Sequence, residues 1–256
     1  MGLQYGIKEV LNVGLVDFAT KKPILYTDYA TASTNEVQGE RTFISGGQGN
    51  YRLMAFDHSK TSTLQMTFPL VDLKLLALAL GDDLIQGAGT VYAREVLTVT
   101  SGKVTVSQTP IDNTISVFAL QGLRDNGTEY TKVASAPTST QFAWTSGSKD
   151  ITFNTSENGK QVVVWYQYNT VSTAQKFTIK ANKFPKMLTI FGEGLFRDQE
   201  TDVDRAVRVN FFKAKPQQNV TLTMSSENTT TLEITFDLFA VKDASGDYAY
   251  AEYVLL

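Results

Sequence analysis

Residues 61–68 read Thr-Ser-Thr-Leu-Gln-Met-Thr-Phe, and this short stretch decides the fold class. Threonine or glutamine stands at positions 61, 63, 65 and 67, and the positions between and after them carry Ser62, Leu64, Met66 and Phe68. Successive side chains of a β-strand point to opposite faces, so this alternation predicts a strand with one polar face and one mostly apolar face.

The same alternation extends outward from this stretch and indicates an all-β chain. Before it, strands are expected at residues 13–18, 24–29, 35–44 and 51–56. The polar run Asp57-His58-Ser59-Lys60 is expected to be the turn of a hairpin between residues 51–56 and 61–68. Three glycines within residues 46–49 break the alternation, because glycine adopts backbone angles that other residues resist. Later strands are expected at residues 176–181, 187–191, 206–212, 220–225, 232–239 and 248–255.

One segment has the pattern of a helix. Residues 70–80 carry leucine or valine at positions 70, 71, 73, 75, 76, 78 and 80, and Gly81 is suited to end the helix. Asp72 falls in the expected first turn, where the helix dipole favours a negative charge. Because most of its surface is apolar, we expect the helix to pack between its own sheet and a neighbouring subunit.

The spacing of the strands changes near Ser101. Between residues 103 and 168 the expected strands are short and alternate with turns at Asp125-Asn126-Gly127, Ser146-Gly147 and Asn158-Gly159, as in a small β-sandwich. We therefore expect a discontinuous domain at residues 1–100 and 171–256, interrupted by an inserted domain at residues 101–170. The predicted fold class is all-β: an antiparallel β-sandwich or half-barrel with one short flanking helix, plus a small inserted Ig-like sandwich.

Composition limits the classes of function. The chain of 256 residues is 42% apolar and 19% charged, which suits a packed core and argues against disorder. Its net charge of −3 gives no electrostatic basis for holding nucleic acid. Without cysteine it has neither disulfides nor a thiolate metal site. We expect no secretory signal and no membrane-spanning helix, because no apolar run approaches the ~20 residues that a span requires.

Three features invite a chemical interpretation, and each has a simpler one. The single histidine, His58, lies in an expected surface turn without a visible catalytic partner. The loop at residues 46–49 lacks the Lys-Ser/Thr that ends a phosphate-binding loop, which favours a tight connection between strands. Four alternating carboxylates could supply oxygen ligands to calcium, or form a solvated acidic loop: Asp198, Glu200, Asp202 and Asp204. We therefore predict a protein that is not an enzyme and has no cofactor.

Several segments, in order, carry a resemblance to phage tail tube proteins. They are the loop Phe43-Ile44-Ser45-Gly46-Gly47-Gln48-Gly49-Asn50, the stretch Ala55-Phe56-Asp57-His58-Ser59-Lys60-Thr61-Ser62-Thr63-Leu64, the leucine-rich residues 73–81, and the C-terminal stretches 184–186, 192–197, 212–216, 219–224 and 232–238. The resemblance spans residues 1–98 and 175–256. The chain resembles the family outside its middle segment, and Ig-like insertions are common in phage tails.

The resemblance implies a structural role. Such subunits form hexameric rings that stack around a lumen, contact other tail proteins such as the tape measure, and let DNA pass without specific binding. It further implies a location in the tail of the virion after synthesis in the host cytoplasm, with no membrane involved.

Within this interpretation, alternation selects candidate surfaces. The lumen-facing candidates are Glu36, Gln38, Glu40, Thr63 and Gln65. The same pattern is equally compatible with these side chains facing solvent on the outside of the ring. The subunit-interface candidates come from the expected helix and its first turn: Leu70, Leu73, Leu75, Leu76, Leu78 and Leu80.

Two other functions remain open from the sequence. The first is a capsid decoration protein or another structural component of the virion. The second is a carbohydrate-binding adhesin module, which would use Trp144, Trp165 and exposed tyrosines on a solvent-facing platform.

Overall fold

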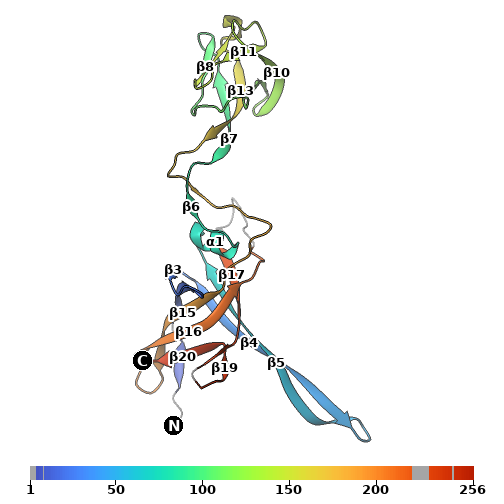
Figure 1. Ribbon diagram of the computed structural model, residues 1–256, viewed down its shortest axis with the longest axis vertical. Coiled ribbons are helices and arrows are strands. Elements are labelled where there is room, and N and C mark those ends of the chain that lie inside the picture. Colours follow the sequence, from blue (N-terminus) through green and yellow to red (C-terminus); the bar gives the residue numbers. More distant parts are fainter. Residues whose placement is uncertain (1–3, 8, 221–230, 244) are drawn as a thin grey trace. The chain divides into compact units, whose positions relative to one another are not determined.

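The computed structural model describes residues 4–7, 9–220, 231–243 and 245–256 (Figure 1). These residues form strands almost throughout, with one α-helix, so the predicted all-β class is confirmed. The chain divides into two compact units. Unit 1 comprises Met1–Leu84 and Phe177–Leu256, and unit 2 is Ile85–Lys176.

Unit 1 is built on one antiparallel sheet with the strand order β3-β2-β15-β16-β17-β5-β4. The bounds of these strands are β2 (Asn12–Asp17), β3 (Pro23–Thr27), β4 (Ala32–Gly46), β5 (Tyr51–Phe68), β15 (Leu188–Asp198), β16 (Asp204–Pro216) and β17 (Leu232–Leu238). Two more strands extend it: β1 (Tyr5–Ile7) pairs with β15, and β20 (Ala251–Leu255) pairs with β16. A separate small ladder joins β18 (Val241–Lys242) to β19 (Tyr248–Ala249).

The hairpin predicted between residues 51–56 and 61–68 is wrong. Residues 51–68 form a single strand, β5, which pairs with β4 from Ala32↔Thr67 to Gly46↔Tyr51. The turn lies instead at the glycine loop, where the Asn50 amide donates to the Gly47 carbonyl over 3.1 Å. The polar residues near Ser59 mark a register shift in a continuous strand, and Ser59 takes a positive φ of 54°. Such a bulge and a turn favour similar residue types, which explains the error.

The core of unit 1 collects alternate side chains of the sheet against the helix. β5 contributes Leu64, Met66 and Phe68, and β17 contributes every second residue from Leu232 to Leu238. These residues are 0–5% exposed. The alternation read from residues 61–68 therefore predicted correctly which face of β5 is buried. The strand expected at residues 220–225 lies, except for Val220, outside the described residues.

The helix α1 (Leu73–Ala79) is shorter than residues 70–80 because both of its ends are fixed by hydrogen bonds. Asp72 is the N-cap, and its carboxylate accepts hydrogen bonds from the backbone amides of Lys74 and Leu75 at 2.7 and 3.1 Å. At the other end, Gly81 and Asp82 donate to the carbonyls of Leu78 and Ala77. This pattern is a Schellman cap, which confirms Gly81 as the stop.

Unit 2 is a seven-stranded sheet with the order β7-β13-β9-β10-β11-β12-β8. Its strands are β7 (Thr90–Thr98), β8 (Lys103–Thr105), β9 (Ser116–Gln121), β10 (Asp125–Val133), β11 (Gln141–Trp144), β12 (Asp150–Phe153) and β13 (Gln161–Asn169). A short ladder joins β6 (Ile85–Gln86) to β14 (Gln175–Lys176). β7 pairs with β13 over its full length, so the unit begins before residue 101. Strands β9, β11, β12 and β13 contribute to one apolar core, which includes Val117, Phe142, Ile151 and Tyr166.

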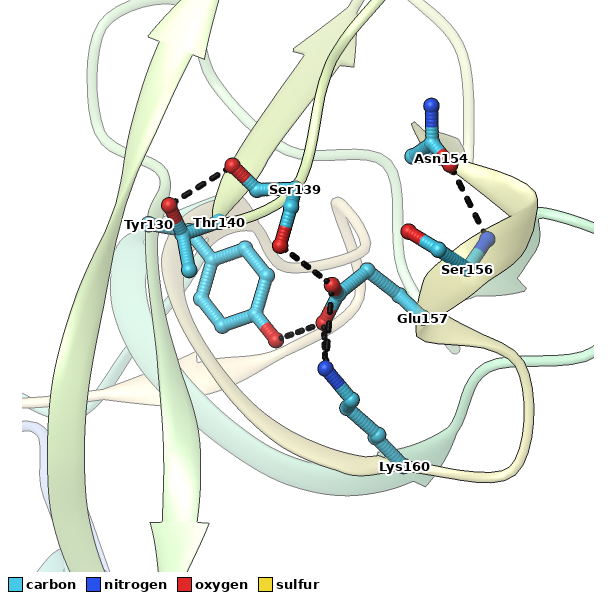
Figure 2. A network of polar contacts seen from close by, with 7 residues as sticks. All are labelled: Tyr130, Ser139, Thr140, Asn154, Ser156, Glu157 and Lys160. Carbon is cyan, nitrogen blue, oxygen red and sulfur yellow. Dashed lines mark hydrogen bonds and ion pairs between the residues drawn. The ribbon is translucent and has the colours of Figure 1, made fainter.

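A buried carboxylate joins three segments of unit 2 (Figure 2). Glu157 ends the 3-10 helix η1 (Thr155–Glu157) and is 0% exposed. It accepts hydrogen bonds from the Tyr130 hydroxyl at 2.5 Å, from Ser139 at 3.0 Å and from the Lys160 ammonium at 3.0 Å. A buried charge is tolerated where hydrogen bonds satisfy its lone pairs in this way. The contacts of Glu157 therefore have a structural role, which is to hold the three segments together.

Candidate functional site: the β4–β5 arm and the polar face

The outer part of the β4–β5 hairpin stands apart from the core of unit 1. Every residue from 36 to 61 is exposed except Gly46, which is half-buried. Residues 36–61 are called the arm here. Within the part of the chain that the structure describes, the strands of the arm pair only with each other, since β17 pairs with β5 only from Ser62 to Phe68 (Figure 1).

Large apolar side chains line both faces of the arm. They are between 39 and 60% exposed: Val37, Phe43, Ile44, Tyr51, Leu53, Met54 and Phe56. An isolated two-stranded hairpin has marginal stability in water, and an exposed apolar patch usually marks a contact surface. The arm is therefore a candidate surface for contact with another protein.

Cross-strand contacts give the arm a defined geometry. The Arg41 guanidinium makes two hydrogen bonds to the Asp57 carboxylate, at 2.5 and 3.1 Å, and thereby lowers the pKa of Asp57. The Arg52 guanidinium lies 3.8 Å from the centre of the Phe43 ring. Such pairs are the unit of stabilisation in a sheet, although exposed ion pairs contribute little singly.

Four of the five lumen-facing candidates lie together on the face of the sheet that points away from the core. Glu36 is directly opposite Thr63, and Gln65 is opposite Thr34 on β4 and Thr235 on β17. The amide of Gln38 donates to the Glu36 carboxylate over 2.6 Å. Since Leu64 and Met66 on the alternate positions are buried, this face points outward.

β17 extends this face with residues that the sequence interpretation missed. Glu233, Thr235 and Asp237 alternate with buried residues and lie opposite Thr67, Gln65 and Thr63. Gln65 donates a hydrogen bond to Glu233, and Gln217 donates one to Asp237. The alternation Leu-Glu-Ile-Thr-Phe-Asp-Leu in residues 232–238 was the signal that could have found them.

This surface is called the polar face, and it consists of Glu36, Gln38, Thr63, Gln65, Glu233, Thr235 and Asp237. Three of these residues are acidic, and Lys215 lies opposite Asp237 at one border. The result is a polar surface with an excess of negative charge.

Glu40, the fifth candidate, lies in the arm beyond the register shift. Its carboxylate is 3.4 Å from Nδ1 of His58, whose Nε2 lies 2.8 Å from the Thr42 hydroxyl. The prediction that His58 lies in a turn is wrong, because it lies within β5. Its neighbours are an exposed glutamate and two hydroxyls, which form no enclosed catalytic constellation.

The candidate interface leucines divide into two groups. Leu75, Leu76 and Leu78 are 1–8% exposed and belong to the core of unit 1, and Leu80 packs against that core. Leu70 and Leu73 are 64% and 43% exposed. Only these two offer an apolar surface to another molecule.

The acidic segment at residues 198–204 connects β15 to β16. The Asp198 carboxylate accepts hydrogen bonds from the amides of Glu200 and Thr201, and Arg197 binds Asp204 through two hydrogen bonds of 2.7 and 3.0 Å. The carboxylates of Asp198 and Asp204 are thus engaged by backbone amides and a cation, and the described residues contain no group of three acidic or histidine ligands arranged around a metal.

The two tryptophans do not form an open platform. Trp144 is 8% exposed in the core of unit 2 and donates from Nε1 to the Ser148 carbonyl. Trp165 is half-buried, its Nε1 donates to Asn126, and the Arg94 guanidinium lies 5.6 Å from its ring centre.

Among the described ranges, none of the helices is long and apolar enough to span a membrane. A search of curated proteins finds no match to the chain. The sequence model of the YomU/Tube protein family, in contrast, matches residues 5–251, which include the arm, the polar face and unit 2. This match covers nearly the whole chain and agrees with the resemblance to phage tube proteins, and the chain therefore belongs to the YomU/Tube protein family.

Proposed function

We propose that this chain is the subunit of a phage tail tube that assembles, as the tail tube resemblance implies, into stacked hexameric rings around a lumen for DNA. The family membership supports a structural role in the phage tail. The observation that carries the finer proposal is the arm, a hairpin of unit 1 whose apolar side chains are exposed on both of the hairpin's faces.

The arm favours self-association. Burying its seven large apolar side chains against another subunit would remove them from water, and each fully buried side chain contributes about 1.5–3 kcal/mol. An exposed edge strand is also a template for pairing, and closure of a ring covers such edges. Among the described residues, β5 is the only strand that pairs with β4, so the other edge of β4 is open to pairing with another subunit.

The polar face suits the wall of a DNA channel. Its carboxylates and amides offer no cationic cluster that would hold phosphates, so DNA would slide past it. In this arrangement Glu36, Gln38, Thr63, Gln65, Glu233 and Asp237 face the lumen. Glu40, in the arm, would continue the acidic lining.

Leu70 and Leu73 supply a second contact between subunits. Other tail proteins, such as the tape measure, would meet the assembled tube. The subunit acts without catalysis, is made in the host cytoplasm and resides in the virion tail.

Negative-stain microscopy of the purified protein tests the proposal. Long tubes or closed rings are expected, whereas a capsid decoration protein would stay small until capsids are added. The matched variant replaces residues 39–60 with Asn-Gly, a turn that closes the remaining ladder at Gln38↔Thr61. This variant should give the circular dichroism spectrum of a folded β protein and form no tubes. Tubes of normal length from it would refute the role of the arm.

A further inference from the structure

A groove in unit 1 opens directly onto the core. It has a volume of about 480 Å³ and is lined by the N-terminal segment together with β4, β5, β15, β16 and β20. Its lining includes the core residues Leu64 and Val209, which are 0–1% exposed. Ile7 and Tyr253, at 76% and 53% exposure, form its rim.

The rim of the groove is held in place by a polar contact. The Asn35 side-chain amide donates to the Tyr253 hydroxyl over 2.8 Å, which ties β4 to β20 at the groove. Water in an opening that leads to core side chains is energetically unfavourable, because those side chains then lack packing partners. The groove is thus suited to receive apolar side chains from outside the subunit.

We infer that this groove receives the tip of the arm of a second copy of the chain, an inference that rests on the proposed function. The tip, residues 42–56, presents apolar side chains of the size that the groove accommodates: Phe43, Ile44, Leu53, Met54 and Phe56.

Charge complementarity supports this match. Arg52 is the single charged residue within residues 42–56 of the sequence. Glu9 is the single charged residue among the described residues that line the groove. A tip with one cation would thus meet a groove with one carboxylate, and opposite charges across an interface fix its register.

The tip cannot occupy the groove of its own subunit. Asn35 borders the groove, and Ile44 lies nine positions further along the same continuous strand. At roughly 3.4 Å per residue, a paired strand carries the tip about 30 Å from the groove. The contact is therefore between two copies, and because arm and groove are different surfaces it propagates from copy to copy.

Disulfide trapping tests the inference, and the absence of cysteine from the chain removes any background. In the variant Ile7→Cys/Met54→Cys, oxidation of assembled tubes should give a ladder of covalent multimers on a non-reducing gel. Tyr253→Cys/Met54→Cys should do the same from the other side of the rim. The control Leu123→Cys/Met54→Cys uses a residue of unit 2 that is 92% exposed and should give no ladder.

The possible results separate the two proposals. Tubes that form normally but give no ladder with either rim cysteine would overturn the docking inference and leave the tube function standing. Failure of the unmodified protein to form any polymer would overturn both. Disulfide-linked dimers from Ile7→Cys alone would mean that two grooves face each other, which also overturns the inference.

A charge swap provides an independent measurement. Glu9→Lys and Arg52→Glu should each raise the protein concentration needed for tube formation about fivefold, and the double variant should return to within about twofold of the unmodified protein. Both positions are exposed in the subunit, so folding should be unaffected. Additive losses in the double variant would contradict pairing of the two residues.

Discussion

Ile85 lies opposite Lys176 in the short antiparallel ladder of β6 and β14. The chain therefore enters and leaves unit 2 through neighbouring residues. In unit 1 the adjoining segments are also tied together, because the Asp82 carboxylate accepts hydrogen bonds from the Thr178 amide at 3.0 Å and from Lys183 at 3.1 Å. These bonds hold the pKa of Asp82 well below its usual range. This is the geometry expected of an insertion.

We predict that unit 2 is dispensable for assembly. Replacing Ile85–Lys176 with a short Gly-Ser linker should leave unit 1 folded, because Asp82 already holds the two cut ends close together. Circular dichroism should report a β protein, and microscopy should show tubes. Loss of folding would mean that unit 1 requires unit 2, contrary to the insertion interpretation.

The helix α1 should separate folding from assembly. Leu75→Asp places an unpaired charge at a position that is 1% exposed, and should unfold unit 1. Leu73→Asp, at 43% exposure, should leave the subunit folded and reduce tube formation. Circular dichroism and microscopy of the two variants distinguish these effects. Normal tubes from the Leu73 variant would remove α1 from the subunit interface.

Gly81 should be intolerant of any side chain. Its φ is +81°, and a Cβ there would lie 2.6 Å from the backbone of Phe184. Gly246 is the matched control, since its φ is +90° but a Cβ would meet nothing within 4 Å. Gly81→Ala should cost roughly 1–3 kcal/mol more than Gly246→Ala, because a clash with backbone adds to the strain that both share. Equal melting temperatures for the two variants would contradict the clash.

Local alternation predicted much of the sheet, for a physical reason. Where one face of a strand meets a core, as at Leu64 and Met66, the pattern of side chains records which face is buried. The same reasoning failed in the arm. Both faces of residues 36–61 are exposed in the subunit, so no burial pattern records the strand, and polar residues such as Asp57 and Ser59 resembled a turn.

The candidate surfaces were predicted only in part. The polar face required knowing that β17 lies beside β5, a pairing between residues 232–238 and 62–68 that a local pattern does not contain. The groove likewise joins Leu11, Leu64 and Val209 from distant parts of the chain. The helix stop at Gly81, in contrast, depends on neighbouring residues alone and was predicted correctly.

Glu157 should make unit 2 sensitive to acid. Burial favours the neutral form, but hydrogen bonds from Tyr130, Lys160 and Ser139 outweigh it, and the pKa of Glu157 is lowered from its ordinary value of 4.5. The unfolded chain therefore takes up a proton at a higher pH than the folded one. The stabilisation by this group is complete above about pH 4.5 and is lost as pH falls through the folded pKa.

Tryptophan fluorescence can follow this loss in the intact chain, because both tryptophans, Trp144 and Trp165, lie in unit 2. Glu157→Gln should destabilise unit 2 by roughly 1–3 kcal/mol at neutral pH and flatten the acid dependence. The exposed Glu129→Gln is the control and should change neither. An unaltered pH profile in the Glu157 variant would remove this carboxylate as the cause.

The polar face should control the passage of DNA. Glu36 and Glu233 lie on this face at exposed positions, so Glu36→Lys with Glu233→Lys should leave folding and ring assembly intact. The lumen would then present lysines, and phosphates of the passing DNA would gain attractive partners.

In phage particles that carry the variant, tails should look normal by microscopy while infectivity falls by about tenfold or more. The control, Glu129→Lys with Glu200→Lys, makes the same change in charge at exposed positions that do not belong to the polar face, and should preserve infectivity. Because salt screens such contacts, higher ionic strength should partly restore DNA release from the variant particles. Equal infectivity of the two double variants would place the polar face outside the lumen.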